Sequence, residues 1–349
     1  MIGTFERIGP LFVTAKQTKM ISESPYPLRF RPLIKQTIWG GSKLGRLLGK
    51  SIGGEDNYAE SWEVVDHGRD QSIVENGPLA GKTLTELIQS SPQWVLGGGQ
   101  RGLGDGQAEA TFPLLLKYLD CNRVLSVQVH PDDDYGAKME IPDRGKTEAW
   151  YVVDVEPGSL IYAGLKTGVD RNSLAQAMAA GETDRVLHSF HPEPGDCVFI
   201  PAGTVHALGA GLVIAEIQQS SDTTFRLFDW NRVGVDGAPR TLHVDQSLEV
   251  SDYQSGPVRP RKTDKTVVGW QSLVRCDKFA LSSLENGSAP VGGDGRFNIL
   301  TVPSGKAVLT TSDDVMQLAR GQSILLPAAM SRCTVTAEEA STVLLANPG

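Results

Sequence analysis

Cysteine is scarce in this chain, with four residues among 349, and no two of them form a CxxC pair. Such scattered cysteines argue against a disulfide framework and predict reduced, mostly buried thiols in a cytoplasmic protein. The four residues are Cys121, Cys197, Cys276 and Cys333.

Long apolar runs are also missing from the sequence. No stretch approaches the roughly 20 apolar residues that span a bilayer, so we expect no membrane segment. The first residues carry Glu6 and Arg7 and no apolar core, so we expect no signal peptide.

Positive charge is in deficit, because the formal net charge is −8 at pH 7. The absence of a basic stripe argues against a nucleic-acid partner. The same net charge repels a sugar phosphate at long range, so any phosphate site has to be locally basic. The glycine-rich stretch 97–106 lacks the Lys-Ser/Thr ending of a P-loop and predicts a loop of the kind that often covers a site.

Glycine and proline, in contrast, are frequent, with 38 and 20 residues and no fixed period. This composition is typical of many short strands joined by tight turns, and the length suggests about two domains. We expect a mainly β fold with a few short helices. They should lie at about 83–96, where Thr83 and Glu86 have capping-box spacing, and at 170–190, as one helix to 180 and a second over 184–190.

The stretch from Gly195 to His206 has the most informative spacing. A short apolar run at 197–200 predicts a buried strand, and Pro201 and Gly203 then turn the chain. His206 follows directly, so its imidazole should point from a strand edge into the mouth of a barrel. This spacing resembles the second motif of the cupin barrels.

A partner for this motif stands upstream, in the sequence Ser-Val-Gln-Val-His-Pro at 126–131. Side chains alternate along a strand, so Gln128 and His130 should share a face. Glu148 stands at the head of a further apolar run. Together with His206 these residues would give an N/O ligand set that suits a divalent metal with an open position.

Several segments together resemble type I mannose-6-phosphate isomerase (phosphomannose isomerase), in a short form. The matching pieces, in order, are IWGG at 38–41, ESWE at 60–63, FPLLLKYLD at 112–120, VQVHPDD at 127–133, GKTEAWYV at 145–152, PAGTVHAL at 201–208 and EIQQSSDTTFRLFDWNR at 216–232. The resemblance is specific in the middle of the chain and vague after residue 252. The large helical insertion of longer members has no room between 158 and 193.

This resemblance implies a metal-dependent interconversion of mannose 6-phosphate and fructose 6-phosphate through an enediol(ate). His130 and His206 fit a metal site by their own settings, whereas only the family pattern makes Gln128 and Glu148 ligands. One divalent ion is expected. Zn(II) is favoured, although Mn, Fe or Co would also suit these ligands.

The resemblance also implies that Arg226 is the catalytic arginine, on one face with Asp222 and Thr224 if this segment is a strand. A lysine near a metal and an arginine would have a lowered pKa, so Lys146 and Glu216 both stay open as the base. Glu216 has the alternative of a structural acid. The phosphate candidates are Lys117 and Arg232, each of which has the alternative of pairing with a nearby acid.

The C-terminal part contains a weak echo of the cupin motif, because Gly321 and Pro327 repeat the spacing of Gly195 and Pro201. No histidine occurs from 265 to 349, so we expect a second, degenerate cupin-like barrel without a metal. A chance match in a glycine-rich protein is the alternative. The expected division is an extension at 1–26, a catalytic domain at 27–250, a linker at 251–264 and the degenerate domain at 265–349.

Two other functions compete with this interpretation. One is a different cupin enzyme, such as an isomerase of another sugar or an iron oxygenase. The other is a cupin that binds a sugar phosphate without turning it over. For the isomerase and for the binding cupin alike, the expected partner is a small sugar phosphate.

Overall fold

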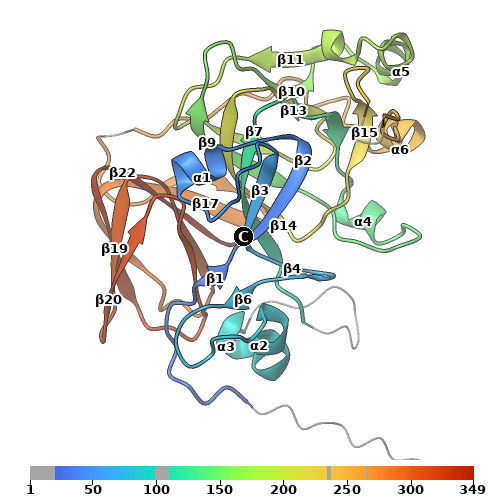
Figure 1. Ribbon diagram of the computed structural model, residues 1–349. Coiled ribbons are helices and arrows are strands. Elements are labelled where there is room, and N and C mark those ends of the chain that lie inside the picture. The colour runs from blue at the N-terminus through green and yellow to red at the C-terminus, as the bar shows by residue number, and fades with distance from the viewer. Residues whose placement is uncertain (1–19, 99–109, 234–236, 265) are drawn as a thin grey trace, which may run out of the picture.

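The computed structural model describes residues 20–98, 110–233, 237–264 and 266–349. The glycine-rich stretch that predicted a loop lies largely outside the described residues, as does most of the expected N-terminal extension. The fold is mainly β, as predicted, with the first unit in blue to yellow and the second in orange to red (Figure 1). No described helix has the length and apolar character needed to cross a membrane.

The first unit consists of two antiparallel sheets that share one core. The six-stranded sheet has the order β12 (Cys197–Ile200), β9 (Glu148–Val155), β14 (Leu212–Gln219), β7 (Leu114–Cys121), β3 (Tyr58–Val64) and β2 (Leu33–Gly41). The five-stranded sheet has the order β11 (Leu187–Phe190), β10 (Ile161–Leu165), β13 (His206–Leu208), β8 (Val127–Val129) and β15 (Phe225–Phe228). In the described residues these sheets are open and lie against one another rather than closing into one continuous barrel.

The second unit is built on one seven-stranded antiparallel sheet. Its main path is β16 (Gln271–Arg275), β17 (Phe279–Val291), β22 (Cys333–Pro348), β18 (Asn298–Ser304) and β21 (Ser323–Leu326), and β19 (Lys306–Thr310) and β20 (Val315–Ala319) complete it. Two short ribbons belong to the first unit. They pair β1 (Phe30–Arg31) with β6 (Ile73–Val74) and β4 (Asp66–His67) with β5 (Asp70–Gln71).

The helices are short and lie at the margins of the sheets (Figure 1). They are α1 (Lys43–Leu48), α2 (Leu84–Ser90), α3 (Pro92–Val95), α4 (Asp133–Gly136), α5 (Arg171–Ala180), a 3-10 turn (Thr183–Val186) and α6 (Val244–Val250). Thr83 and Glu86 form the predicted capping box of α2. The predicted helix over 184–190 is wrong, because its second half is strand β11, which pairs with β10.

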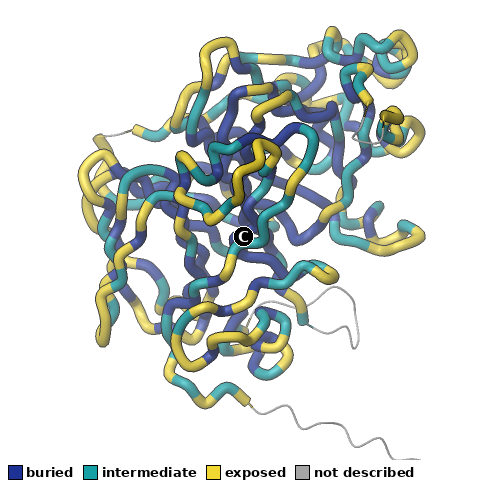
Figure 2. Tube along the Cα trace, in the orientation of Figure 1, coloured by how far each residue is buried: buried dark blue, intermediate teal, exposed yellow. Residues whose placement is uncertain are grey.

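The central strands of the six-stranded sheet are buried on both faces, which explains their nearly continuous apolar sequences (Figure 2). On β14, Leu212 and Ile214 join the core between the two sheets of the first unit, whereas Ala215 and Ile217 face the second unit. Because side chains alternate, Glu216 points into the first unit. The same alternation directs Lys117 of β7, and Glu148 and Trp150 of β9, into the first unit.

The expected linker at 251–264 packs against the first unit. Val258 donates its N–H to the carbonyl of Ala163, and Arg261 and Cys197 exchange two backbone hydrogen bonds of 2.8 Å. The domain boundaries given above remain a proposed division of the chain.

Candidate metal centre and active site

Three separate segments bring the four predicted metal ligands together. Gln128 lies on β8, and His130 follows that strand directly. His206 opens β13 and pairs in register with Gln128. Glu148 opens β9 in the opposite sheet, so the four side chains meet between the two layers.

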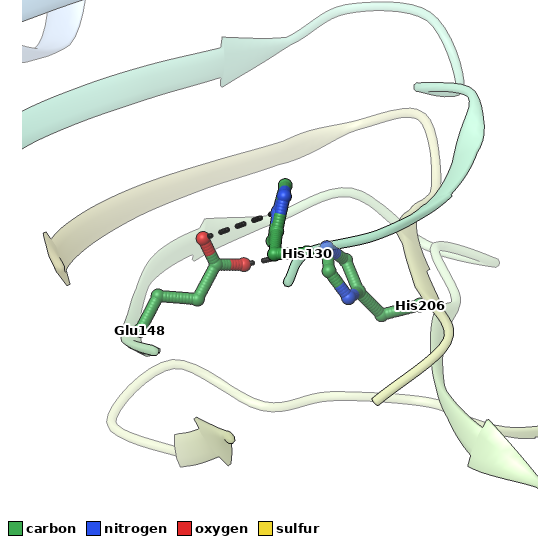
Figure 3. A group of neighbouring side chains, drawn as sticks. All are labelled: His130, Glu148 and His206. Carbon is green, nitrogen blue, oxygen red and sulfur yellow. Dashed lines mark ion pairs between the residues drawn. The ribbon is translucent and has the colours of Figure 1, made fainter. Parts of the chain in front are cut away.

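The separations among these side chains match the coordination sphere of a small ion (Figure 3). Nε2 of His130 lies 3.6 Å from Oε2 of Glu148, and Nε2 of His206 lies 3.4 Å from Oε1 of Glu148. Gln128 borders this group, and its amide nitrogen lies within hydrogen-bond distance of Nε2 of His206, at 3.2 Å. Ligands about 2.0–2.1 Å from a tetrahedral zinc ion are roughly 3.3–3.4 Å apart, so the pocket has the right size.

Hydrogen bonds to the backbone fix both imidazoles. Nδ1 of His130 donates to the carbonyl of Thr223, and Nδ1 of His206 donates to the carbonyl of Thr204, each over 2.8 Å. This arrangement leaves the Nε2 lone pairs directed toward Glu148, as is common for histidines that bind a metal.

The ligand atoms lack the partners that burial demands. His130, Glu148 and His206 are each at most 1% exposed. Nε2 of His130 and both carboxylate oxygens of Glu148 have no hydrogen-bond partner among the described residues. A buried carboxylate in this state is costly unless a cation is nearby, and Lys146 Nζ, 3.2 Å away, supplies only one. These residues therefore fit a divalent ion, and no other described group of three such side chains does.

The histidines are held in their neutral, metal-binding form. Burial lowers the pKa of His206 to about 4. Burial, with help from the charge of Lys146 and from His206, lowers the pKa of His130 well below its usual range. Both imidazoles thus offer a free lone pair at neutral pH.

A cavity of about 350 Å³ adjoins the metal ligands, and Gln128 belongs to its wall. Four basic and three acidic side chains line it, so it is locally basic in an acidic protein, as the sequence requires for a phosphate site. The charged residues are Lys117, Lys146, Arg226, Arg240, Glu60, Glu216 and Asp222. Asp222 and Thr224 do share this wall with Arg226, although both precede strand β15.

Lys117 lies in this wall between two carboxylates. Its Nζ is 3.0 Å from Oε1 of Glu216 and 3.3 Å from Oε2 of Glu60. Burial alone would lower the pKa of Lys117, but the two carboxylates outweigh burial and raise it. The phosphate role predicted for Lys117 therefore has to compete with two ion pairs.

Glu216 is held by Lys117 and by Trp150, whose indole N–H donates to Oε2 over 2.9 Å. Burial and the charge of Glu148 raise the pKa of Glu216, and Lys117 and Lys146 offset this shift only in part. A carboxyl group with a raised pKa suits a base that works near neutral pH.

Two arginines near the mouth share a single carboxylate. Nε of Arg240 donates to Asp229 over 2.7 Å, and Nε of Arg232 donates to Asp229 over 3.0 Å. Arg232 also donates to the carbonyl of Val124 and does not line the cavity, whereas Arg240 does. The alternative of pairing with an acid is thus realised for Arg232. Arg226 avoids this pairing: it donates to the carbonyl of Thr241, and its buried Nε has no partner among the described residues.

The sequence did not single out two residues of this region. Arg240 stands beyond the last matching motif, and its local sequence gives no sign of a site. Asp143 accepts hydrogen bonds from the hydroxyls of Ser221 and Thr223, and the carbonyl of Thr223 in turn holds His130. Both roles depend on contacts between distant segments, which no local pattern records.

Comparison with family models gives two matches. Residues 28–157 match the catalytic domain of type I phosphomannose isomerase, and residues 270–344 match the cupin domain of mannose-6-phosphate isomerase. The second match confirms a cupin-type fold for the C-terminal unit, as the weak glycine–proline echo suggested.

Relatives cover nearly the whole chain. The mannose-6-phosphate isomerase ManA of Bacillus subtilis is 34% identical over 305 residues, 86% of this chain and 93% of the relative. The mannose-6-phosphate isomerase of Streptococcus mutans is 33% identical over 310 residues, 86% and 92% of the two chains. A crystal structure of the B. subtilis mannose 6-phosphate isomerase superposes with a TM-score of 0.77 at 30% identity, covering 92% of this chain and 99% of the other. The resemblance seen in the sequence is confirmed, and the chain belongs to the type I phosphomannose isomerase family.

Proposed function

We propose that this chain interconverts mannose 6-phosphate and fructose 6-phosphate with one divalent ion, Zn(II) being favoured. Gln128, His130, Glu148 and His206 would hold the ion. The observation that carries the proposal is the set of buried ligand atoms without hydrogen-bond partners, next to a basic cavity. The free state of all four cysteines supports a cytoplasmic location.

The reaction moves a proton between C2 and C1 of the open-chain sugar through an enediol(ate). The bound ion would supply Lewis acidity that polarises the oxygens at these carbons. Glu216 takes the proton from C2 of mannose 6-phosphate and returns it to C1, because its raised pKa and its place in the cavity wall suit a base. Lys146, beside Glu148, donates a hydrogen bond to a substrate oxygen and limits the build-up of negative charge.

Arg226 adds fixed positive charge to the same reaction. The Cα of Arg226 pairs in register with the Cα of Gln128, a proposed metal ligand, so the side chain of Arg226 leaves the backbone beside the metal centre. Its buried Nε has no partner among the described residues and is free to donate to the oxyanion that forms.

The phosphate end of the substrate requires a cation that faces the cavity. Arg240 meets this requirement, and Asp229 fixes its orientation through both carboxylate oxygens. Arg232 shares Oδ1 of Asp229 with Arg240 and acts as a brace rather than as a direct phosphate ligand. Arg240→Gln should therefore raise KM for the sugar phosphate much more than Arg232→Gln does.

A coupled assay tests the function directly. Metal-loaded and chelated protein are incubated with mannose 6-phosphate, and the formation of fructose 6-phosphate is followed. Turnover should disappear with the chelator and return with added Zn(II). Binding of the sugar phosphate without chelator-sensitive turnover would refute the enzyme and leave a binding protein.

Two variants separate holding the metal from using it. His206→Ala should lose both bound metal and turnover, because it removes a ligand. Arg226→Ala should keep the metal and lose most turnover. An Arg226→Ala variant as active as the parent would remove the arginine from the mechanism.

A further inference from the structure

An ion pair joins the C-terminal unit to the start of α4 in the first unit. Lys278 lies in the turn between β16 and β17, and its Nζ is 2.8 Å from Oδ2 of Asp133 at the start of α4. The turn is closed by a hydrogen bond from the N–H of Cys276 to the carbonyl of Phe279. The lysine is therefore presented from a short, hydrogen-bonded turn.

The other oxygen of Asp133 holds the segment that carries Lys146 and Glu148. Oδ1 accepts the N–H of Gly145 over 2.8 Å and the side-chain amide of Gln219 over 2.9 Å. The carbonyl of that amide accepts the N–H of Thr147 over 3.0 Å. Asp133 thus fixes residues on both sides of Lys146.

The chain is packed tightly at this point. A Cβ atom on Gly145 would lie 2.4 Å from the backbone of Asp132 and Asp133, so the segment at Gly145 is in direct contact with the start of α4. Lys146 donates its N–H to the carbonyl of Pro131, next to the ligand His130. A shift of Asp133 would therefore be passed to Lys146 and Glu148.

We infer that Lys278 of the C-terminal unit, through Asp133, positions the catalytic segment 145–148 and so sets the metal affinity and the turnover of the site. Lys278 is a positioning residue, because it reaches the site only through Asp133. This inference rests on the metal site proposed above. It gives the C-terminal unit an indirect part in catalysis.

The alternative is that the pair merely joins the two units. The side chains of Lys278 and Asp133 are 29% and 33% exposed, and partly exposed ion pairs contribute little to stability. A joining role therefore predicts a small loss of thermal stability and no change at the metal. A positioning role predicts a change at the metal with little loss of stability.

The test measures metal affinity by chelator competition, the spectrum of the cobalt-substituted protein, and kcat and KM. Lys278→Met should weaken Zn(II) binding and lower kcat, each by about 10-fold, as losses of groups that orient metal ligands do. KM should stay within about twofold, because the phosphate end is untouched. Lys278→Arg should restore most of both losses.

Variants of Asp133 grade the effect. Asp133→Asn keeps an acceptor for Gly145 and Gln219 but loses the ion pair, so it should match Lys278→Met. Combining it with Lys278→Met should weaken Zn(II) binding no further, because the second ion pair of Lys278, at 2.7 Å with Asp277, lies within its own turn and only the pair with Asp133 reaches the segment 145–148. Asp133→Ala loses the acceptor as well and should weaken metal binding further.

The matched control is Thr301→Val, which removes another contact between the units, the 2.6 Å hydrogen bond between the hydroxyls of Thr301 and Tyr118. It should lower the melting temperature and leave Zn(II) affinity unchanged. The inference is overturned if Lys278→Met and Asp133→Asn bind Zn(II) and turn over like the parent, or if Thr301→Val weakens Zn(II) binding equally. Metal affinity is measured without substrate. If Lys278→Met and Asp133→Asn shift the Zn(II) affinity but neither the parent nor any variant turns over mannose 6-phosphate, the proposed reaction is refuted and the positioning role of Lys278 at the metal stands.

Discussion

Replacing Lys117 by Met would remove the cation that pairs with both Glu60 and Glu216. At the observed distances of 3.0 and 3.3 Å, each attraction comes to about 5 kcal/mol at an effective dielectric constant of 20. Desolvation of the buried Lys117 and Glu216, and of Glu60, whose side chain is 18% exposed, offsets much of this energy. We expect Lys117→Met to lower the free energy of unfolding by about 3–5 kcal/mol, chiefly the cost of leaving the buried Glu216 without its partner.

The loss should depend on pH in a defined direction. Burial alone would raise the pKa of Glu60, but the charge of Lys117 and the hydrogen bond from Trp62 outweigh burial and lower it. Glu60 therefore contributes stability that is present above its unfolded pKa and is lost as pH falls through its folded pKa. Without Lys117, the carboxyl groups of Glu60 and Glu216 take up protons at higher pH, so the gap between variant and parent should narrow on acidification.

Urea denaturation at about pH 7 and about pH 5 measures this gap. Lys50→Met is the matched control, because Lys50 is as buried as Lys117 and lies 2.6 Å from the buried Glu63, with neither residue in the cavity wall. Lys50→Met should lower the free energy of unfolding by a similar amount and leave kcat unchanged, whereas Lys117→Met should lower both quantities. A loss below about 1 kcal/mol, or one equal at both pH values, would refute the reasoning.

Three further substitutions test the surroundings of the site. Asp143→Ala should weaken Zn(II) binding about 10-fold in chelator competition, with Asp143→Asn in between, since Asp143 fixes the Thr223 carbonyl that orients His130. His67→Gln should remove a pH dependence of the unfolding free energy. The hydrogen bond to Asp143 outweighs burial and raises the pKa of His67. The stability that His67 contributes is therefore present below about pH 6.5 and is lost as pH rises through its folded pKa. Equal unfolding profiles for His67→Gln and the parent would contradict this assignment. Gly145→Ala should lower both the melting temperature and kcat, because its Cβ would overlap the backbone at 132–133; an alanine variant with parental kcat would show that this contact does not fix the segment.

The sequence predicted the part of the site that depends on local spacing. Alternation along β8 places Gln128 and His130 together, and the proline–glycine turn places His206 at a strand edge. The pairing of Arg232 with Asp229, three residues away, was within reach of the sequence as an alternative, whereas the pairing of Arg240 with the same carboxylate was not, because Arg240 stands beyond the last matching motif. The strand at β11 was missed for a similar reason, since pairing with β10 overrides a local sequence that favours helix.

The alternation of side chains on the central strands links the C-terminal unit to the chemistry. On β7, β9 and β14, one face carries Lys117, Glu148 and Glu216, and the other face packs against the second unit. The apolar side chains on that outer face include Leu116, Tyr118, Ala149, Tyr151 and Ile217, all buried. Burying a large apolar side chain contributes about 1.5–3 kcal/mol, so exposing these side chains would cost on the order of the whole stability of a domain. The second unit is thus required for the sheet that carries the catalytic groups, and Lys278 adds a direct contact to this general support.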